Sequence, residues 1–112
     1  MEVTVERRGE IAVVSVAGSI DATTAPGLAS ALSEQIERGG ARLVADFSGV
    51  AYTSSAGLRA VLGALKEARQ HGGDLRLAGV RPAVLRVLEM SGFTSILKYF
   101  ADVSGAVTSF AS

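Results

Sequence analysis

The fold is decided by residues 42–68, RLVADFSGVAYTSSAGLRAVLGALKEA. The segment begins with an apolar run over residues 42–47, which is typical of a buried strand. After a turn, a second set of apolar residues repeats with the 3.6-residue period of an α-helix. The expected buried face comprises Leu58, Val61, Leu62, Leu65 and Ala68. Arg59 and Lys66 should point outward, so the segment predicts a strand, a turn and an amphipathic helix.

Strands and helices alternate on both sides of this unit. The patterns predict strands at residues 2–6, 11–16, 42–47, 75–78 and 96–100. They predict helices that start near Thr23 or Thr24, at Ser54 or Ser55, at Pro82 and at Asp102. A hairpin followed by alternating helices and strands indicates an α/β fold. We therefore expect one domain over residues 1–112, with a mixed β-sheet of four to five strands and about four α-helices.

Composition excludes several classes of function. The chain has 112 residues and no cysteine, which rules out disulfides and thiolate zinc sites. Eleven basic and eleven acidic residues cancel without clustering, so nucleic acid is not an expected partner. No apolar run approaches the ~20 residues of a membrane-spanning helix, and the first eight residues do not resemble a signal peptide. We expect a cytoplasmic protein without membrane insertion.

Catalysis is not expected, although the turn before the central helix carries two serines. A nucleophile elbow needs glycine two residues before the serine, and Thr53 occupies that position relative to Ser55. The single histidine, His71, lies 16 residues beyond Ser55 on the same predicted helix. At ~1.5 Å of rise per residue the two would be roughly 24 Å apart, too far for a base to activate the serine. A serine hydrolase is therefore a remote alternative, and we expect no metal and no cofactor.

The two serines themselves allow two interpretations. Ser54 or Ser55 could serve only as an N-cap, which contributes ~1 kcal/mol to helix stability. Alternatively, one hydroxyl could be a functional group at the exposed start of the helix. Tyr52, just before them, is expected to anchor the return of the chain.

Further segments along the chain favour the functional interpretation. The segments at residues 46–50 and 52–58 resemble the phosphoacceptor region of STAS-domain anti-sigma factor antagonists. Later and earlier landmarks are similar as well and occur in the same order. These are Gly18-Ser19-Ile20-Asp21, Gly72-Gly73-Asp74-Leu75, Gly79-Val80-Arg81-Pro82-Ala83-Val84 and Met90-Ser91-Gly92-Phe93. The resemblance covers nearly the whole chain and implies the STAS fold.

The resemblance implies that Ser55 is the phosphoacceptor. In that family an aspartate precedes the acceptor and a second serine follows it, whereas here Ser54 and Ala56 occupy those positions. Ser54 is therefore an alternative acceptor. Asp21 matches an acidic residue that the family has beside the acceptor, but it could equally be a turn or capping residue. With Gly57, these residues would support the switch, and the expected partner contacts are Ser19, Asp21, Thr23, Ser54, Ser55 and Arg59.

The resemblance also implies the function and the partners. Such a protein binds an anti-sigma factor that is also a serine protein kinase, and thereby frees a sigma factor. Phosphorylation by that kinase releases it, and a PP2C-type phosphatase resets it. ATP and magnesium would belong to the kinase. A second alternative is a STAS scaffold subunit of a lipid-transport or stressosome-like assembly.

Overall fold

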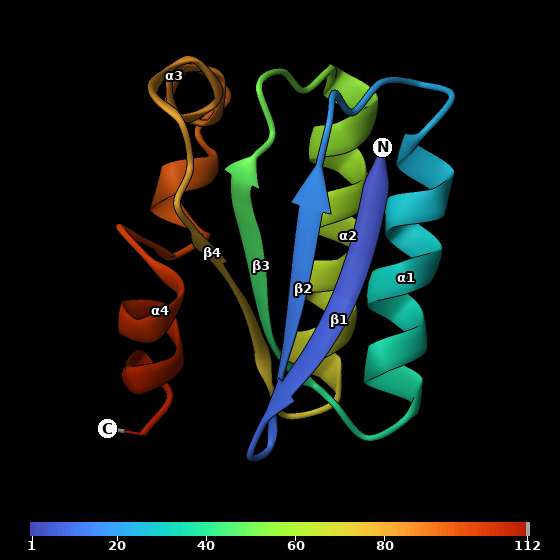
Figure 1. Ribbon diagram of the computed structural model, residues 1–112, viewed down its shortest axis with the longest axis vertical. Coiled ribbons are helices and arrows are strands. Elements are labelled where there is room, and N and C mark those ends of the chain that lie inside the picture. Colours follow the sequence, from blue (N-terminus) through green and yellow to red (C-terminus); the bar gives the residue numbers. More distant parts are fainter. Residues whose placement is uncertain (112) are drawn as a thin grey trace.

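The computed structural model describes residues 1–111 and contains one five-stranded sheet with helices on both faces (Figure 1). The strand order is β1-β2-β3-β4-β5. β1 is antiparallel to β2, and each later neighbour is parallel to the one before it. The strands are Glu2–Arg8 (β1), Ile11–Ala17 (β2), Arg42–Gly49 (β3), Asp74–Ala78 (β4) and Tyr99–Phe100 (β5). The predicted mixed α/β sheet is confirmed.

Three α-helices and one short 3₁₀ helix connect the strands from β2 to β5, and a fourth α-helix follows β5. They are Ala25–Glu37 (α1), Ser55–Gln70 (α2), Pro82–Met90 (α3), Phe93–Ser95 (η1) and Val103–Ser109 (α4). α1 and α2 lie side by side along one face of the sheet, and α4 lies on the other (Figure 1). Because both faces are covered, the apolar run of β3 is continuous rather than alternating.

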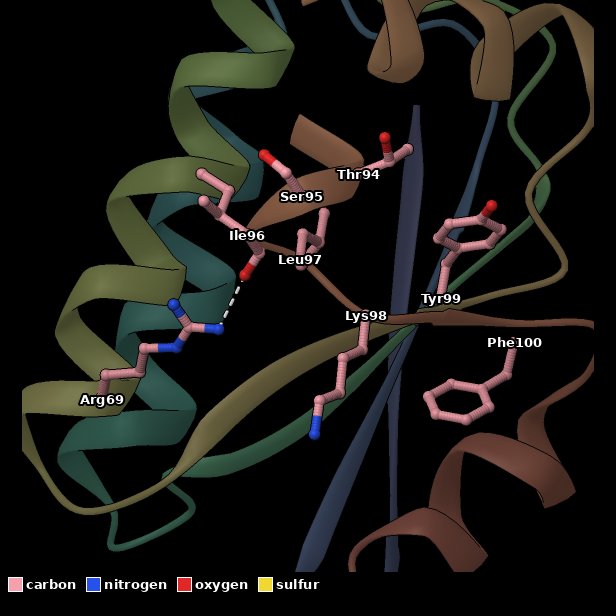
Figure 2. A pocket seen from close by; sticks show the side chains of 8 residues that line it. All are labelled: Arg69, Thr94, Ser95, Ile96, Leu97, Lys98, Tyr99 and Phe100. Atoms are coloured by element: carbon pink, nitrogen blue, oxygen red, sulfur yellow. Dashed lines mark hydrogen bonds between the residues drawn. The ribbon is translucent and has the colours of Figure 1, made fainter. Parts of the chain in front are cut away.

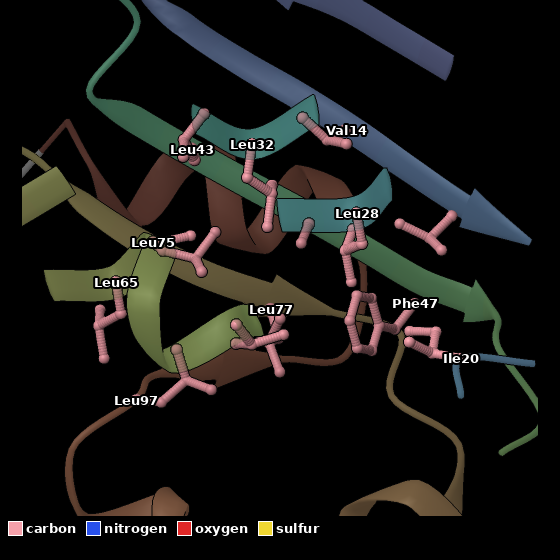
Figure 3. Close-up of a cluster of buried hydrophobic side chains, with 14 of the residues drawn as sticks. Val14, Ile20, Leu28, Leu32, Leu43, Phe47, Leu65, Leu75, Leu77 and Leu97 are labelled. Carbon is pink, nitrogen blue, oxygen red and sulfur yellow. The ribbon is translucent and has the colours of Figure 1, made fainter. Parts of the chain in front are cut away.

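The main core fills the space between the sheet and the helices α1 and α2 (Figure 3). Leu43 and Phe47 project from β3 into it and meet Leu28 of α1 and Leu65 of α2, all nearly inaccessible to solvent. Neighbouring residues on the same strands, such as Val44, point to the opposite face and contact Ala106 of α4. The core therefore fixes α2 against β3, and with it the position of the α2 start.

The C-terminal helix α4 is fastened to the sheet by Arg76. The guanidinium carbon of Arg76 lies 3.9 Å from the ring centre of Phe110. Its Nη1 donates to the hydroxyl of Ser109 at 2.7 Å, and its Nε donates to Asp74 at 3.0 Å. The second layer thus depends on a partly buried ion pair and a stacked ring as well as on apolar packing.

Two sequence-based expectations about strands need correction. The predicted strand at residues 96–100 is reduced to Tyr99–Phe100. The carbonyl of Ile96 instead accepts a 2.7 Å hydrogen bond from Arg69, and Leu97 N–H bonds back to Phe93. The alternation of polar and apolar residues over residues 2–6 predicts a half-buried strand, but β1 forms a sheet edge and Val5 is 44% exposed.

The central helix follows the predicted face with one difference. Leu58, Val61 and Leu65 are buried, and Arg59 and Lys66 are exposed. Leu62 was expected on the buried face but is only half-buried. It packs against the margin of the core, beside the face of α2 that is fully covered.

Candidate functional site

The candidate site lies where the parallel strands β2, β3 and β4 end. The carboxyl ends of parallel strands meet at one edge of a sheet, which is where open α/β folds bind their ligands and partners. Here three loops meet, at residues 18–24, 50–54 and 79–81. The third is tied to β3 by Arg81, whose Nε donates to the carbonyl of Ser48 at 2.9 Å.

The first two loops are joined by backbone hydrogen bonds. Ile20 and Thr53 form an isolated parallel bridge beyond the ends of the strands. The N–H of Ile20 donates to the carbonyl of Tyr52 at 3.0 Å, and the N–H of Ser54 donates to the carbonyl of Ile20 at 2.8 Å. Ile20 and Thr53 are themselves buried. The residues just before α2 are therefore rigidly placed against the loop that carries Ser19 and Asp21.

Ser54 and Ser55 differ in position: one caps α2, and the other lies at the exposed start of the helix. Ser54 is the N-cap of α2, is half-buried, and accepts a 3.4 Å hydrogen bond from the N–H of Gly57. Ser55 is the first residue of the helix and is exposed. Within residues 1–111 its hydroxyl makes no hydrogen bond. The capping interpretation is therefore correct for Ser54, whereas the hydroxyl of Ser55 is exposed and takes no part in the cap.

Gly57 allows α2 to start directly against the first loop. A Cβ atom at this position would overlap the hydroxyl of Thr53 and lie 2.8 Å from Cγ2 of Ile20. Any larger residue would push the helix start away from Thr53 and Ile20. The glycine thus supports the site through shape.

Asp21 organises its own loop. Its Oδ1 accepts hydrogen bonds from the N–H groups of Thr23 at 2.9 Å and Thr24 at 3.0 Å. In return the N–H of Asp21 donates to the Thr24 hydroxyl at 2.9 Å. The hydrogen bond from the backbone of Thr24 is the main cause that holds the pKa of Asp21 below its ordinary value of 3.8.

These bonds correct the expected cap of α1. Thr24 occupies the N-cap position, but its side chain makes no capping bond to the helix. Asp21 instead stabilises the turn before α1, and its carbonyl accepts a hydrogen bond from the N–H of Ala25 at 2.8 Å. The structure therefore shows Asp21 as the turn residue before α1, and any further role at the switch is separate from this one.

The electrostatics around Ser55 favour an anion. Free N–H groups at the first turn of α2 carry partial positive charge. That turn contains no acidic side chain. Arg59 lies four residues after Ser55 on the same helix face, is exposed, and makes no ion pair with any residue of the described chain. A phosphate on Ser55 would meet one available cation and the helix N-terminus.

The predicted contact residues fall together at this end of the molecule. Ser19, Asp21, Thr23, Ser55 and Arg59 are exposed, and Ser54 is half-buried. Sequence reasoning misjudged Tyr52, because the residue is 55% exposed and its side chain is not a buried anchor. It also missed Ile20, the buried residue beneath Gly57, although an isoleucine inside the polar run Ser19-Ile20-Asp21 was a usable signal.

His71 lies at the other end of α2, as expected. It is the C-cap residue, and its ring Nδ1 is 2.9 Å from the carbonyl oxygen of Glu67. Ser55 and His71 therefore cannot form a nucleophile–base pair.

The hollow in Figure 2, of ≈ 530 Å³, is also away from Ser55. It is lined by Arg69 and residues 94–100, and Arg69 crosses it to reach the carbonyl of Ile96. Arg69 comes 14 residues after Ser55 on α2, so this lining residue lies about 21 Å along the helix from Ser55.

Two further searches of residues 1–111 concern metal binding and membrane-spanning helices. No group of three or more His, Cys, Asp or Glu side chains in this range is arranged to bind a metal ion. No helix in the same range is long and apolar enough to cross a membrane.

Comparison with known proteins gives a consistent result. The sequence matches the STAS domain family over residues 2–106. It is 34% identical over 110 residues to BtrV of Bordetella bronchiseptica, covering 98% of this chain and 95% of that protein. It is 36% identical over 85 residues to the anti-sigma-B factor antagonist of Listeria monocytogenes, covering 76% and 75%. The crystal structure of an anti-sigma factor antagonist from Mycobacterium paratuberculosis has a TM-score of 0.90 and 26% identity, covering 99% and 94%.

Proposed function

The chain belongs to the STAS domain family, and we propose on that basis that it is a cytoplasmic anti-sigma factor antagonist controlled by phosphorylation of Ser55. The observation that carries the proposal is the state of Ser55: an exposed, unbonded hydroxyl on the first residue of α2. The name of the Listeria monocytogenes relative supports the choice of an anti-sigma factor as the partner.

The unphosphorylated protein would bind an anti-sigma factor that is also a serine protein kinase, and so free a sigma factor. The contact surface would comprise Ser19, Asp21, Thr23, Ser54, Ser55 and Arg59. All six come from the joined loops or the first turns of α2, so a single partner surface can cover them. ATP and magnesium would be brought by the kinase.

Phosphorylation would then release the partner without a change of fold. A phosphate adds ~1.5–2 negative charges at neutral pH. On the free protein these charges are compatible with the helix N-terminus and Arg59. Under a docked partner they would lose water, and without a facing cation this costs several kcal/mol. A PP2C-type phosphatase would restore binding.

This mechanism requires no catalysis by the chain itself. Ser55 would act as the substrate of another enzyme, since the only histidine is at the opposite end of α2. A scaffold role in a lipid-transport or stressosome-like assembly would use the same fold, but no feature of the site favours it over the switch.

The test is phosphosite mapping with a candidate serine kinase of the anti-sigma type, ATP and magnesium. We expect mass spectrometry to locate one phosphate on Ser55, and Ser55→Ala to abolish its incorporation. Ser54→Ala is the matched control: it removes only the long cap bond, costs about 0.5 kcal/mol of stability, and should still be phosphorylated. Phosphate on Ser54 alone would contradict the assignment of the acceptor.

A further inference from the structure

The strand β1 leaves one edge of the sheet open. It is the first strand in the order and has only β2 beside it. In Figure 1 it is the dark blue strand at the margin of the sheet. An edge strand presents a row of N–H and C=O groups to which another strand can bind.

The turn after β1 determines which of its peptide groups face outward. Gly9 and Glu10 form a two-residue turn, and Gly9 has φ +63°, as the first position of a type II′ hairpin requires. Arg8 and Ile11 are therefore the closing pair that shares hydrogen bonds. Hydrogen-bonded and non-hydrogen-bonded pairs alternate along an antiparallel ladder. It follows that Val3, Val5 and Arg7 direct their peptide groups away from β2.

We propose that this outward row pairs with the same row of a second copy of the chain, antiparallel and centred on Val5. Val5 then faces the partner's Val5, and Val3 faces the partner's Arg7. Every residue in these pairs has its peptide groups directed outward, so the ladder can form without disturbing β2. The result is a closed two-fold dimer with one continuous ten-stranded sheet.

Charge selects this register over its neighbours. Only shifts by two residues keep the outward peptide groups in contact. In the proposed register Glu2 lies opposite the partner's Arg8, and two-fold symmetry forms this pair twice. A shift of the partner strand by two residues in one direction would instead place Glu2 opposite the partner's Glu6. A shift by two residues in the other direction would place Glu6 opposite the partner's Glu6. Like charges directly opposite each other destabilise a sheet, so both alternatives are disfavoured.

The side chains concerned are available for this contact. Glu2, Glu6 and Arg8 are exposed, and the existing pair between Arg8 and Glu6 at 2.9 Å would extend into a network with the partner's Glu2. Val5 is a 44% exposed apolar residue at the centre of the proposed contact. Pairing would cover it with an identical side chain.

The dimer should be weak because the shared edge is only seven residues long. We expect a dissociation constant on the order of 100 µM, as for small transient interfaces. Sedimentation equilibrium at low salt should show the mass rising with concentration from 11.5 kDa toward twice that value. Because two ion pairs contribute, the dimer should weaken as salt is added.

Charge reversal provides the decisive comparison. Glu2→Arg or Arg8→Glu alone should weaken the dimer about tenfold or more, because each change places like charges opposite each other twice. The double variant Glu2→Arg/Arg8→Glu should recover most of the affinity. Glu89→Arg, an equal charge change at an exposed position on α3, should have no effect. Absence of recovery in the folded double variant would overturn the register.

Amide hydrogen exchange tests the outward row itself and does not depend on Ser55. Raising the protein concentration should slow exchange at Val3, Val5 and Arg7, while Thr4 and Glu6 remain protected throughout by β2. Val5→Pro removes an outward donor but no bond to β2, and should abolish the dimer in a folded protein. A chain that stays monomeric at the highest concentration, or concentration-dependent protection elsewhere only, would overturn the proposal.

Discussion

Gly57 lies directly against Ile20: a Cβ atom on the glycine would be 2.8 Å from the isoleucine Cγ2. We predict that Gly57→Ala lowers the free energy of unfolding by about 1–3 kcal/mol, since it forces two packed segments apart. It should also reduce phosphorylation of Ser55, two residues earlier.

Gly63 supplies the matched control on the same helix. It is exposed, and an added Cβ would meet nothing within 4 Å. Gly63→Ala should therefore raise stability by about 0.5–1 kcal/mol. Chemical denaturation of both variants measures the contrast. Equal effects at the two positions would mean that Gly57 has no special packing role.

A second prediction concerns Arg59. Phosphorylated Ser55 and Arg59 are four residues apart on α2, so they should form an ion pair. We predict that phosphorylation stabilises the wild-type protein by about 0.5 kcal/mol more than it stabilises Arg59→Ala. Thermal melting of the four species measures this difference. Lys66→Ala, at an exposed position farther along α2, should behave like the wild type, and an equal loss there would point to a general charge effect.

The third prediction is a pH dependence at Asp21. Its pKa in the folded protein lies below the ordinary value of 3.8, mainly through the hydrogen bond from the Thr24 backbone. The ionised form is therefore favoured by folding, and its contribution to stability is complete above the unfolded pKa. That contribution is lost as the pH falls below 3.8 through the lower folded pKa.

The stability difference between the wild type and Asp21→Ala should thus be constant near neutrality and shrink in acid. Asp21→Asn keeps one acceptor oxygen without a titrating group, so its difference from Asp21→Ala should not change with pH. Denaturation across the acid range measures both. A wild-type difference that grew as the pH fell would contradict the assigned direction.

The fourth prediction concerns the attachment of α4. Arg76→Ala removes the ion pair with Asp74, the bond to Ser109 and the contact with Phe110. We expect a loss of about 2 kcal/mol, with faster amide exchange throughout α4. Arg86→Ala, at an exposed position on α3, should change stability by less than about 0.5 kcal/mol. Unchanged exchange in α4 would show that apolar packing alone attaches this helix.

Local patterns were sufficient for much of this structure. The apolar period of residues 58–68 and the turn residues around it predicted α2, its buried face and its exposed start, because these depend on side chains a few positions apart. Contacts between distant residues could not be seen in this way. The bond from Arg69 to Ile96 spans 27 residues and shortens β5.

The site shows the same division. Ser54 and Ser55 were both plausible caps, because the residue pattern cannot say which of two adjacent hydroxyls faces the helix amides. The bridge between Ile20 and Thr53 fixes the chain just before α2, and Ser54 is the residue that it places at the N-cap. Tyr52 was misjudged for a related reason, since its neighbour Thr53 takes the buried position.

The most direct test of the switch is the affinity of one anti-sigma factor kinase for the protein with and without phosphate on Ser55. Isothermal titration calorimetry with ADP and magnesium present would measure both forms. We predict about a thousandfold weaker binding of the phosphorylated form, equivalent to ~4 kcal/mol. Ser55→Ala should bind like the unphosphorylated protein, and Ser55→Glu should fall between them because it carries less charge. Equal affinity of the phosphorylated and unphosphorylated forms would contradict the mechanism.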